Sequence, residues 1–240
     1  AARLVARGVE LAPDSLALTT FYEYYEDAGD AGSYGRIKKI TQPDGSWTEY
    51  TYDADGRIAA TSTPFMDNGI RTVEYDYNYL HVSTDDSNSE DHFYDPRIIT
   101  EKINGQAVST TYHVYISGAG TETEITERCQ SPGAAYGSTG NLRTVRDYHA
   151  SGFLRTSGRL KQVTYPDGRV DTHTYEYGVG QAETHTVTHG TTTDPDGIAY
   201  KTTQEITIED FLGRATRRKP GSTSAAMYTF PSTGPNMNTT

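Results

Sequence analysis

Two segments of this chain, 123 positions apart, repeat one another closely enough to decide what kind of fold is possible. Residues 35–53 read GRIKKITQPDGSWTEYTYD, and residues 158–176 read GRLKQVTYPDGRVDTHTYE. Both have a Gly-Arg start, a central Pro-Asp-Gly and a Thr-Tyr close to the end. Self-similarity of this kind marks repeat architectures, in which each copy is one supersecondary unit packed against its neighbours. The chain is therefore expected to build a surface, a shell or a spacer rather than a single catalytic pocket.

The composition favours β-strands whose faces are partly hydrated. The 240-residue chain has 19 tyrosines against six phenylalanines and one tryptophan, and its apolar fraction is 34%. Tyrosine suits a half-buried pleated surface, because its broad apolar ring ends in a hydroxyl that can form hydrogen bonds. The mean hydropathy of −0.68 makes disorder the competing interpretation. Regular alternation and tight-turn residues argue against disorder.

Charge and hydropathy exclude several classes of partner. A formal net charge of −11 disfavours nucleic acid and anionic membranes, since both are bound by basic patches. No run of 18 apolar residues is present, so no membrane span is expected, and residues 1–15 lack the apolar core of a signal peptide. The single cysteine, Cys129, cannot form an internal disulfide, and no histidine stands near it in an arrangement for nucleophilic catalysis.

Three short strings predict tight hairpin turns. Pro43-Asp44-Gly45 and Pro166-Asp167-Gly168 place proline, aspartate and glycine where a type I turn followed by a bulge needs them. Asn104-Gly105 is the strongest two-residue hairpin signal in the chain. Apolar and polar residues alternate in segments such as TVEYDYNY at 72–79 and QEITIED at 204–210. Period-two alternation is typical of strands, so successive antiparallel hairpins are predicted.

These signals predict an all-β fold of tandem antiparallel β-hairpins. The hairpins are expected over residues 20–219, with insertions near 60–100 and 115–150. Residues 1–20 are expected to be irregular or to hold a short helix that Pro13 would end. Residues 220–240 are rich in proline, glycine, serine and threonine, and are expected to form a linker-like tail.

The string YTYDADGRI at 50–58 resembles the repeat of the Rhs/YD-repeat family. The family pattern is Tyr-x-Tyr-Asp-x-x-Gly-Arg-Leu, and its positions are filled here by Tyr50, Tyr52, Asp53, Gly56 and Arg57, with Ile58 for leucine. Two partial copies keep part of the pattern: Asp210, Gly213 and Arg214 in one, Tyr175 and Gly178 in the other. Glycines 35 and 56 lie 21 positions apart, which fits about one hairpin per repeat.

The resemblance implies a structural role. In Rhs polymorphic toxins and in the BC component of Tc toxins, such repeats form a long β-sheet that spirals into a hollow shell around a toxic C-terminal domain. Teneurins and bacterial wall-associated proteins carry similar barrels at cell surfaces. By this resemblance the chain would form part of a spiralling sheet or shell in a secreted or cell-surface protein of bacterial type. Its partners would be the rest of its own chain and an enclosed C-terminal cargo domain.

Each motif residue also has a physical role within a sheet. Alternate tyrosine rings make cross-strand contacts, the aspartate bonds to N–H groups of the turn, and the glycine supplies a positive φ. The arginine can lie over the next tyrosine or pair with the aspartate. The motif residues are therefore expected to build the sheet and not to bind a ligand.

No cofactor-binding or metal-binding residue is assigned from the sequence. His173, His185 and His189 form the one suggestive histidine cluster, but His185 and His189 would lie roughly 13 Å apart along a strand, too far for one metal. Asp53-Ala54-Asp55-Gly56 and Asp194-Pro195-Asp196-Gly197 resemble the start of a calcium loop, without the glutamate that follows in an EF-hand. Turn formation explains both strings, with calcium as the alternative.

No catalytic residue is assigned either, so the chain is expected not to be an enzyme. Tyr94-Asp95-Pro96 resembles the start of the family's autocleavage region, but the Gly-Arg-Phe of that region does not follow it. No Gly-x-Ser-x-Gly, P-loop or dinucleotide fingerprint appears. Two alternatives to a shell segment are kept: a surface adhesion module that binds carbohydrate or protein through its tyrosines, and a carbohydrate-active enzyme that uses a carboxylate pair.

Overall fold

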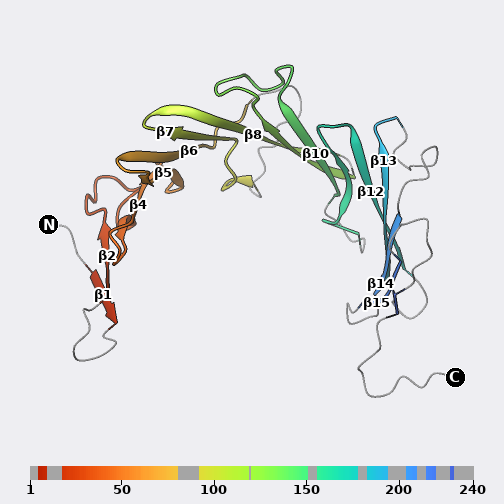
Figure 1. The fold of residues 1–240 in the computed structure, drawn as a ribbon, viewed down its shortest axis with the longest axis horizontal. Coiled ribbons are helices and arrows are strands. Elements are labelled where there is room, and N and C mark those ends of the chain that lie inside the picture. The colour runs from red at the N-terminus through yellow and green to blue at the C-terminus, as the bar shows by residue number, and fades with distance from the viewer. Residues whose placement is uncertain are drawn as a thin grey trace, which may run out of the picture. The chain divides into compact units, whose positions relative to one another are not determined.

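The computed structural model describes residues 5–9, 18–80, 92–118, 120–150, 156–177, 183–193, 204–209, 215–219 and 228–229. Within these ranges the regular elements are all β-strands (Figure 1). The strands are β1 (Val5–Val9), β2 (Leu18–Tyr24), β3 (Ile37–Thr41), β4 (Trp47–Tyr52), β5 (Ile58–Phe65), β6 (Gly69–Asp76), β7 (Ile98–Ile103), β8 (Gln106–Gly118), β9 (Thr121–Arg128), β10 (Leu142–His149), β11 (Leu160–Thr164), β12 (Arg169–Tyr177), β13 (Glu183–Thr191), β14 (Gln204–Glu209), β15 (Ala215–Lys219) and β16 (Tyr228–Thr229).

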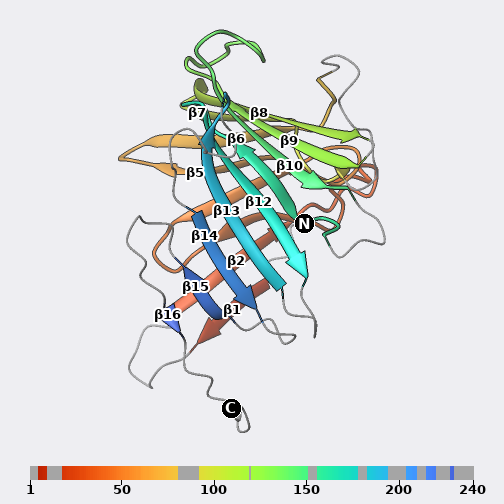
Figure 2. The ribbon, with the colours of Figure 1, turned by 90° about the vertical axis from the view of Figure 1, so that its right-hand side faces the viewer.

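The strands are hydrogen-bonded in the order in which they occur in the chain, from β1 to β16. The described registers are antiparallel, as short connections between sequential strands require. Figure 2 shows one such run, β12, β13 and β14, lying side by side. The predicted all-β fold of tandem antiparallel hairpins is confirmed.

The chain divides into two compact units. The first comprises Ala1–Val114 and Thr126–Leu142, and the second comprises Tyr115–Ile125 and Arg143–Thr240. Among the described residues the buried apolar side chains are Val114 in the first unit and Ile125, Val163 and Val170 in the second. Most other strand residues are only half-buried. With so little buried apolar volume, cross-strand pairs and turn contacts must supply much of the stability.

A register shift recurs at the same point of four hairpins. It brings Tyr24 opposite Ile37 between β2 and β3, and Tyr52 opposite Ile58 between β4 and β5. In the second unit it brings Tyr148 opposite Leu160, and Glu209 opposite Ala215. In each case the second residue directly follows a Gly-Arg pair in the sequence. The shift is therefore a β-bulge that belongs to the repeat itself.

Several segments differ from the sequence expectation. Val5–Val9 forms strand β1 paired with β2, where irregular chain or a helix was expected; Gly8 and the β-branched valines disfavour a helix there. The expected insertions near 60–100 and 115–150 contain most of β5, all of β6, and β9 and β10. Tyr228–Thr229, in the expected tail, pairs with β15 as β16.

Candidate functional site

The Tyr-Asp-x-x-Gly-Arg string closes the turn between β4 and β5. Asp53 N–H donates to Arg57 O at 2.9 Å, and Gly56 N–H donates to Asp53 O at 3.0 Å. Gly56 has a φ of 78°, a conformation that favours glycine. The carboxylate of Asp53 accepts the N–H groups of Asp55 at 3.0 Å and Arg57 at 2.8 Å. Asp53 therefore holds the turn through both its backbone and its side chain.

The Pro-Asp-Gly turns have the same backbone pattern at the other end of the strands. Between β3 and β4, Gln42 N–H donates to Ser46 O at 2.8 Å. The turn Tyr165–Arg169, between β11 and β12, repeats this bond at 2.9 Å. The central residues Asp44 and Asp167 each accept the N–H of the residue two positions later. One turn geometry thus serves both ends of the hairpins.

Two longer loops close with the same bonds. Tyr25 N–H donates to Arg36 O at 3.0 Å, and His149 N–H donates to Arg159 O at 2.9 Å. These bonds correspond to the bond from Asp53 N–H in the short turn. Tyr25 and His149 therefore occupy the position of the motif aspartate, and the loops before Arg36 and Arg159 are insertions into the same turn.

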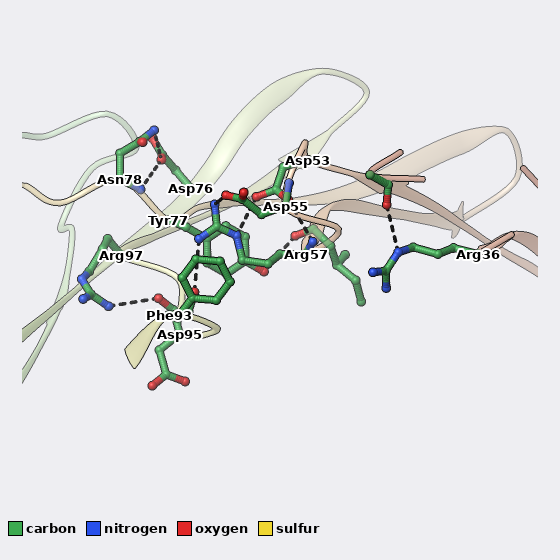
Figure 3. Close-up of polar contacts among 12 residues, drawn as sticks. Arg36, Asp53, Asp55, Arg57, Asp76, Tyr77, Asn78, Phe93, Asp95 and Arg97 are labelled. Carbon is green, nitrogen blue, oxygen red and sulfur yellow. Dashed lines mark hydrogen bonds and ion pairs between the residues drawn. The ribbon is translucent and has the colours of Figure 1, made fainter. Parts of the chain in front are cut away.

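Arg57 contacts residues both inside and outside its own turn (Figure 3). Its Nε donates to Asp53 Oδ2 at 2.7 Å, its Nη2 to Asp55 Oδ2 at 2.9 Å, and its Nη1 to Phe93 O at 3.2 Å. Its Cζ lies 4.4 Å from the ring centroid of Tyr77 and 4.6 Å from that of Phe93. One guanidinium thus joins its own turn, the residue after β6 and the loop before β7.

A tyrosine in or directly after the neighbouring strand contacts the arginine turns at Arg36, Arg57 and Arg159. Tyr52 O–H donates to Ile37 O at 2.8 Å, and the guanidinium of Arg36 lies 5.3 Å from the Tyr52 ring centroid. Two further tyrosines make the same pair of contacts: Tyr77 with Ile58 O at 2.9 Å and Arg57 at 4.4 Å, and Tyr175 with Leu160 O at 2.9 Å and Arg159 at 5.0 Å. We call this arrangement, an arginine over a tyrosine whose hydroxyl binds the carbonyl after the arginine, the tyrosine clip.

The contribution of the Tyr52 hydroxyl to stability can be measured separately from that of the Tyr52 ring. We expect Tyr52→Phe to lower the free energy of unfolding by about 1 kcal/mol, since it removes one hydrogen bond and leaves the ring beneath Arg36 in place. Tyr22→Phe is the matched control, because the Tyr22 hydroxyl has no hydrogen bond to the described residues, and its loss should change stability by less than about 0.5 kcal/mol. Urea unfolding followed by circular dichroism measures both; equal losses would contradict the clip.

The protonation states suit a structural role. Burial raises the pKa of Tyr52 and of Tyr77, so both phenols remain neutral donors at physiological pH. Burial alone would raise the pKa of Asp53, but the N–H and the guanidinium of Arg57 outweigh it, so the pKa is lowered and the carboxylate stays ionised. Burial, followed by the charge of Glu127, raises the pKa of Cys129. That thiol is held protonated, which disfavours a nucleophilic role.

Successive turns in the first unit also touch one another. Arg36 Nε donates to Gly32 O at 2.9 Å. Gly32 packs so closely on the next turn that a Cβ there would collide with Asp53 O, and a Cβ on Gly56 would collide with the Arg36 guanidinium. Together with the contact from Arg57 to Phe93, these contacts link three segments: residues 25–36, 53–57 and 92–97. We call them the arginine-turn edge.

The third segment of this edge does not carry the Gly-Arg signal by which the other turns are recognised in the sequence. Pro96-Arg97-Ile98 stands where the other turns have Gly-Arg followed by an aliphatic residue, and Arg97 is only 2% exposed. Arg97 N–H donates to Asp76 O at 2.7 Å, Nη1 donates to Asp95 O at 3.0 Å, and the guanidinium lies 5.8 Å from the Tyr79 ring centroid. The signal available was an arginine before the aliphatic residue that begins β7.

The structure brings most of the remaining motif residues into the hairpins. Tyr50 lies in β4, and its carbonyl accepts the Tyr25 hydroxyl at 2.8 Å. Asn104 and Gly105 form the turn between β7 and β8 with φ values of 50° and 79°, and Asn104 Oδ1 accepts the N–H of Ile70 at 2.9 Å. Gly178, Asp210, Gly213 and Arg214 lie outside the described residues, as does the string at 194–197.

The three singled-out histidines fall on one face of the β12–β13 hairpin. His173 Nδ1 lies 3.0 Å from His185 Nε2, and His189 Nδ1 lies 2.7 Å from Asp171 Oδ1. His185 and His189 therefore each pair across to β12 and not with one another. Within the described ranges, no group of three or more His, Cys, Asp or Glu side chains could hold a metal ion.

This histidine pair makes the stability of the hairpin depend on pH. Burial, reinforced by His185 and opposed by Asp171, lowers the pKa of His173 below its ordinary value of 6.5. Between that lowered pKa and 6.5, the unfolded chain binds more protons than the folded chain, so the free energy of unfolding falls as the pH falls through this window. We expect urea midpoints measured from pH 7.5 down to pH 5 to show this decline, and His173→Gln to flatten it.

Antiparallel hairpins whose arginine turns recur along the chain define a tandem β-hairpin repeat protein. Residues 33–65, which cover the end of the loop before β3, then β3, β4, the Asp53–Arg57 turn and β5, match the RHS Repeat family. This stretch is thus similar to the repeat of the Rhs/YD-repeat family, which is a structural repeat. No curated protein matches the chain. No helix among the described residues is long and apolar enough to cross a membrane.

Proposed function

We propose that this chain is a wall segment of a larger Rhs-type protein, where it forms part of a β-shell that encloses or presents a toxin or other cargo. The observation that carries the proposal is the arginine-turn edge, in which each turn holds the next by contacts along the border of the sheet. Such contacts let hairpins be added one after another without a thick hydrophobic core. The wall of a shell needs that property, because it is a single sheet that encloses a space and has no thick core of its own.

The strand order supports a wall that continues beyond these hairpins. β1 pairs with β2 and β16 pairs with β15, so each end of the described order offers a strand with one partner. Unpaired strand edges attract further strands, and natural sheets cover or pair them. In the proposed shell these edges are paired by further repeats of the same protein.

The proposed function is compartmentation without bond chemistry. The candidate groups of the first unit are used in turns: Asp53 is bound by Arg57, and the Tyr52 and Tyr77 hydroxyls are bound by backbone carbonyls. A net charge of −11 favours neither nucleic acid nor anionic lipid as a partner. The protein is proposed to act outside the cell or at its surface, as other proteins with such repeats do.

Single-particle electron microscopy of the full-length natural protein tests the proposal. A closed hollow particle with density inside it is the expected result, and mass spectrometry of the particle would identify the enclosed segment. An open rod or filament with no enclosed density would overturn the shell and favour a surface assembly.

A surface adhesion role is the second candidate, because aromatic side chains are exposed on the arginine-turn edge. Tyr94 is 75% exposed and its ring meets that of Phe93 edge to face, with 4.9 Å between centroids. Tyr34, in the loop of residues 25–36, is 56% exposed. Exposed tyrosines can stack on sugars or bind a partner protein. Glycan-array binding that is lost in Tyr94→Ala would favour adhesion, and a screen on polysaccharides tests the carbohydrate-active enzyme.

A further inference from the structure

Two histidines of the second unit face one another across the β12–β13 hairpin. His173 lies opposite Val187 and His185 lies opposite Tyr175, so the two histidines are diagonal neighbours on one face of the pair. Their rings are almost parallel, with an angle of 23° between planes and 5.2 Å between centroids. The nitrogens that face one another, His173 Nδ1 and His185 Nε2, are 3.0 Å apart.

That separation suits a chelate. Imidazole nitrogens bind divalent transition metals at about 2.0–2.1 Å, so two nitrogens 3.0 Å apart would subtend an angle of roughly 90–100° at the metal. An angle near 90° is the one between neighbouring ligands in the tetragonal geometry preferred by Cu²⁺ and Ni²⁺. In the metal-free hairpin one of these two nitrogens donates its N–H to the other. Binding a metal would move that proton to the other nitrogen of the same ring and turn both lone pairs toward the shared ion.

The pair is held ready for this geometry. The His185 ring stacks on Tyr175 with 4.6 Å between centroids and 14° between planes. Tyr175 is itself fixed by its hydrogen bond to Leu160 O at 2.9 Å and by Arg159 over its ring at 5.0 Å. The tyrosine clip of this repeat therefore positions one of the two donors. Preorganised donors raise metal affinity, because less freedom is lost on binding.

The hairpin does not need histidine at this position to form. At the shift of 123 positions that relates the two repeat copies, His173 corresponds to Tyr50, which occupies the same place in β4. The first copy therefore builds the equivalent strand with a phenol.

We propose that His173 and His185 form a two-histidine site for a divalent transition-metal ion, with Cu²⁺ as the best match and water filling the remaining positions. The ion would tie β12 to β13 and so lock this hairpin of the wall. His185 and His189 lie on one strand and do not pair with one another, whereas the two proposed donors come from two strands. His189 forms a hydrogen bond with Asp171, which also accepts the Tyr165 hydroxyl at 3.0 Å. The neighbouring cross-strand pair on this face, His189 and Asp171, is therefore hydrogen-bonded without a metal.

The test is calorimetric titration of the full 240-residue chain with CuCl₂ near pH 7.5, together with electron paramagnetic resonance of the complex. One site with micromolar affinity and a signal from two imidazole nitrogens is expected. His173→Gln and His185→Gln should each weaken that site by about ten-fold or more, because each removes one of two protein ligands. His189→Gln, on the same strand and face as His185, is the matched control and should change affinity less than about two-fold.

A folding control separates loss of the site from loss of the hairpin. His173→Tyr installs the residue that the first copy carries, so it should keep the wild-type circular dichroism spectrum while losing the site. Hydrogen exchange of β12 and β13 amides should slow on adding Cu²⁺ to the wild-type chain and not to His173→Tyr. Unchanged affinity in His173→Gln, or an equal loss in His189→Gln, would overturn the two-histidine site.

Discussion

Arg57→Ala is expected to lower the free energy of unfolding by about 2–4 kcal/mol, a large share of the stability of a sheet whose described residues include few buried apolar side chains. The guanidinium makes hydrogen bonds to two carboxylates and to the carbonyl of Phe93, and it lies over two aromatic rings. Its removal leaves the Asp53 carboxylate, whose side chain is 24% exposed, without its charge partner. That loss is the main reason for the large expected effect.

The size of this effect depends on how far water screens the ion pair. The Arg57 side chain is 15% exposed, so its bonds are shielded better than those of an ordinary surface pair, which is worth roughly 0–1 kcal/mol. A charge-assisted hydrogen bond contributes about 1.5–3 kcal/mol and a cation–π contact about 0.5–1 kcal/mol. These contributions overlap at one group, so the expected total lies below their full sum.

Arg71→Ala is the matched control. Arg71 also pairs with a carboxylate, that of Glu101 on the neighbouring strand, but its side chain is 43% exposed and lies on the face of the sheet. Its loss should cost less than about 1 kcal/mol. Arg57→Lys keeps the charge without the planar fork and should fall between the two. Guanidinium unfolding of all three variants decides the matter: if Arg57→Ala and Arg71→Ala cost the same, the arginine turn does not stabilise the sheet.

Local turn chemistry was predictable because it depends on residues that are close in sequence. Pro43-Asp44-Gly45, Asn104-Gly105 and Pro166-Asp167-Gly168 all lie in hairpin turns between the strands that alternation indicated. The complete motif at Tyr52–Ile58 carries its aspartate, glycine and arginine in one short turn, so its ion pair could be foreseen. All of these features obey rules that span five residues or fewer.

Contacts set by strand register could not be foreseen in the same way. The tyrosine clip joins Tyr52 to Ile37, and the histidine pair joins His173 to His185, across 15 and 12 positions respectively. Which side chains meet depends on the register in which two strands pair, as in β12 and β13, where His173 lies opposite Val187 and Tyr175 opposite His185. Pro96-Arg97 was missed for another reason: its turn lacks the glycine that marks the other copies.

Equivalent positions with different residues show what the repeat itself requires. The motif aspartate is replaced by Tyr25 and by His149 in the longer loops, yet the backbone bonds of the turn are the same. The arginine and the clip tyrosine are kept in those copies, as Arg36 with Tyr52 and Arg159 with Tyr175. We infer that the arginine and its tyrosine define the structural repeat, whereas the aspartate serves the short turn alone.

Gly32→Ala should strongly destabilise the arginine-turn edge. The added Cβ would collide with Asp53 O and lie 3.0 Å from the Cα of Ala54, and both atoms belong to the backbone of the next turn. Neither can swing aside as the end of a side chain can, so the whole loop of residues 25–36 must move away. Overpacking of this kind costs about 1–3 kcal/mol, and we expect the upper part of that range.

The displacement should also reach the tyrosine clip. Gly32 O accepts Arg36 Nε at 2.9 Å, so a shift of the loop draws Arg36 away from the ring of Tyr52. In Gly32→Ala, hydrogen exchange at the amides of Asp53 and Gly56, which close the next turn, should therefore speed up together with that of the loop itself. Linked opening of two turns distinguishes a packed edge from a row of independent hairpins.

Gly29→Ala is the control in the same loop. A Cβ on Gly29 would lie 3.1 Å from Asp27 Oδ1, the end of an exposed side chain that accepts the Gly29 N–H at 2.8 Å. Because this side chain can rotate and water can replace its hydrogen bond, the cost should stay below about 1 kcal/mol. Thermal unfolding and hydrogen exchange of both variants separate the two possibilities. Equal stability of Gly32→Ala and Gly29→Ala, with exchange confined to the loop, would show that the turns are not coupled. A large loss of stability in Gly32→Ala alone would show that neighbouring turns stabilise one another through direct contact. Such contacts would then allow the sheet to be extended by one hairpin after another without a thick core.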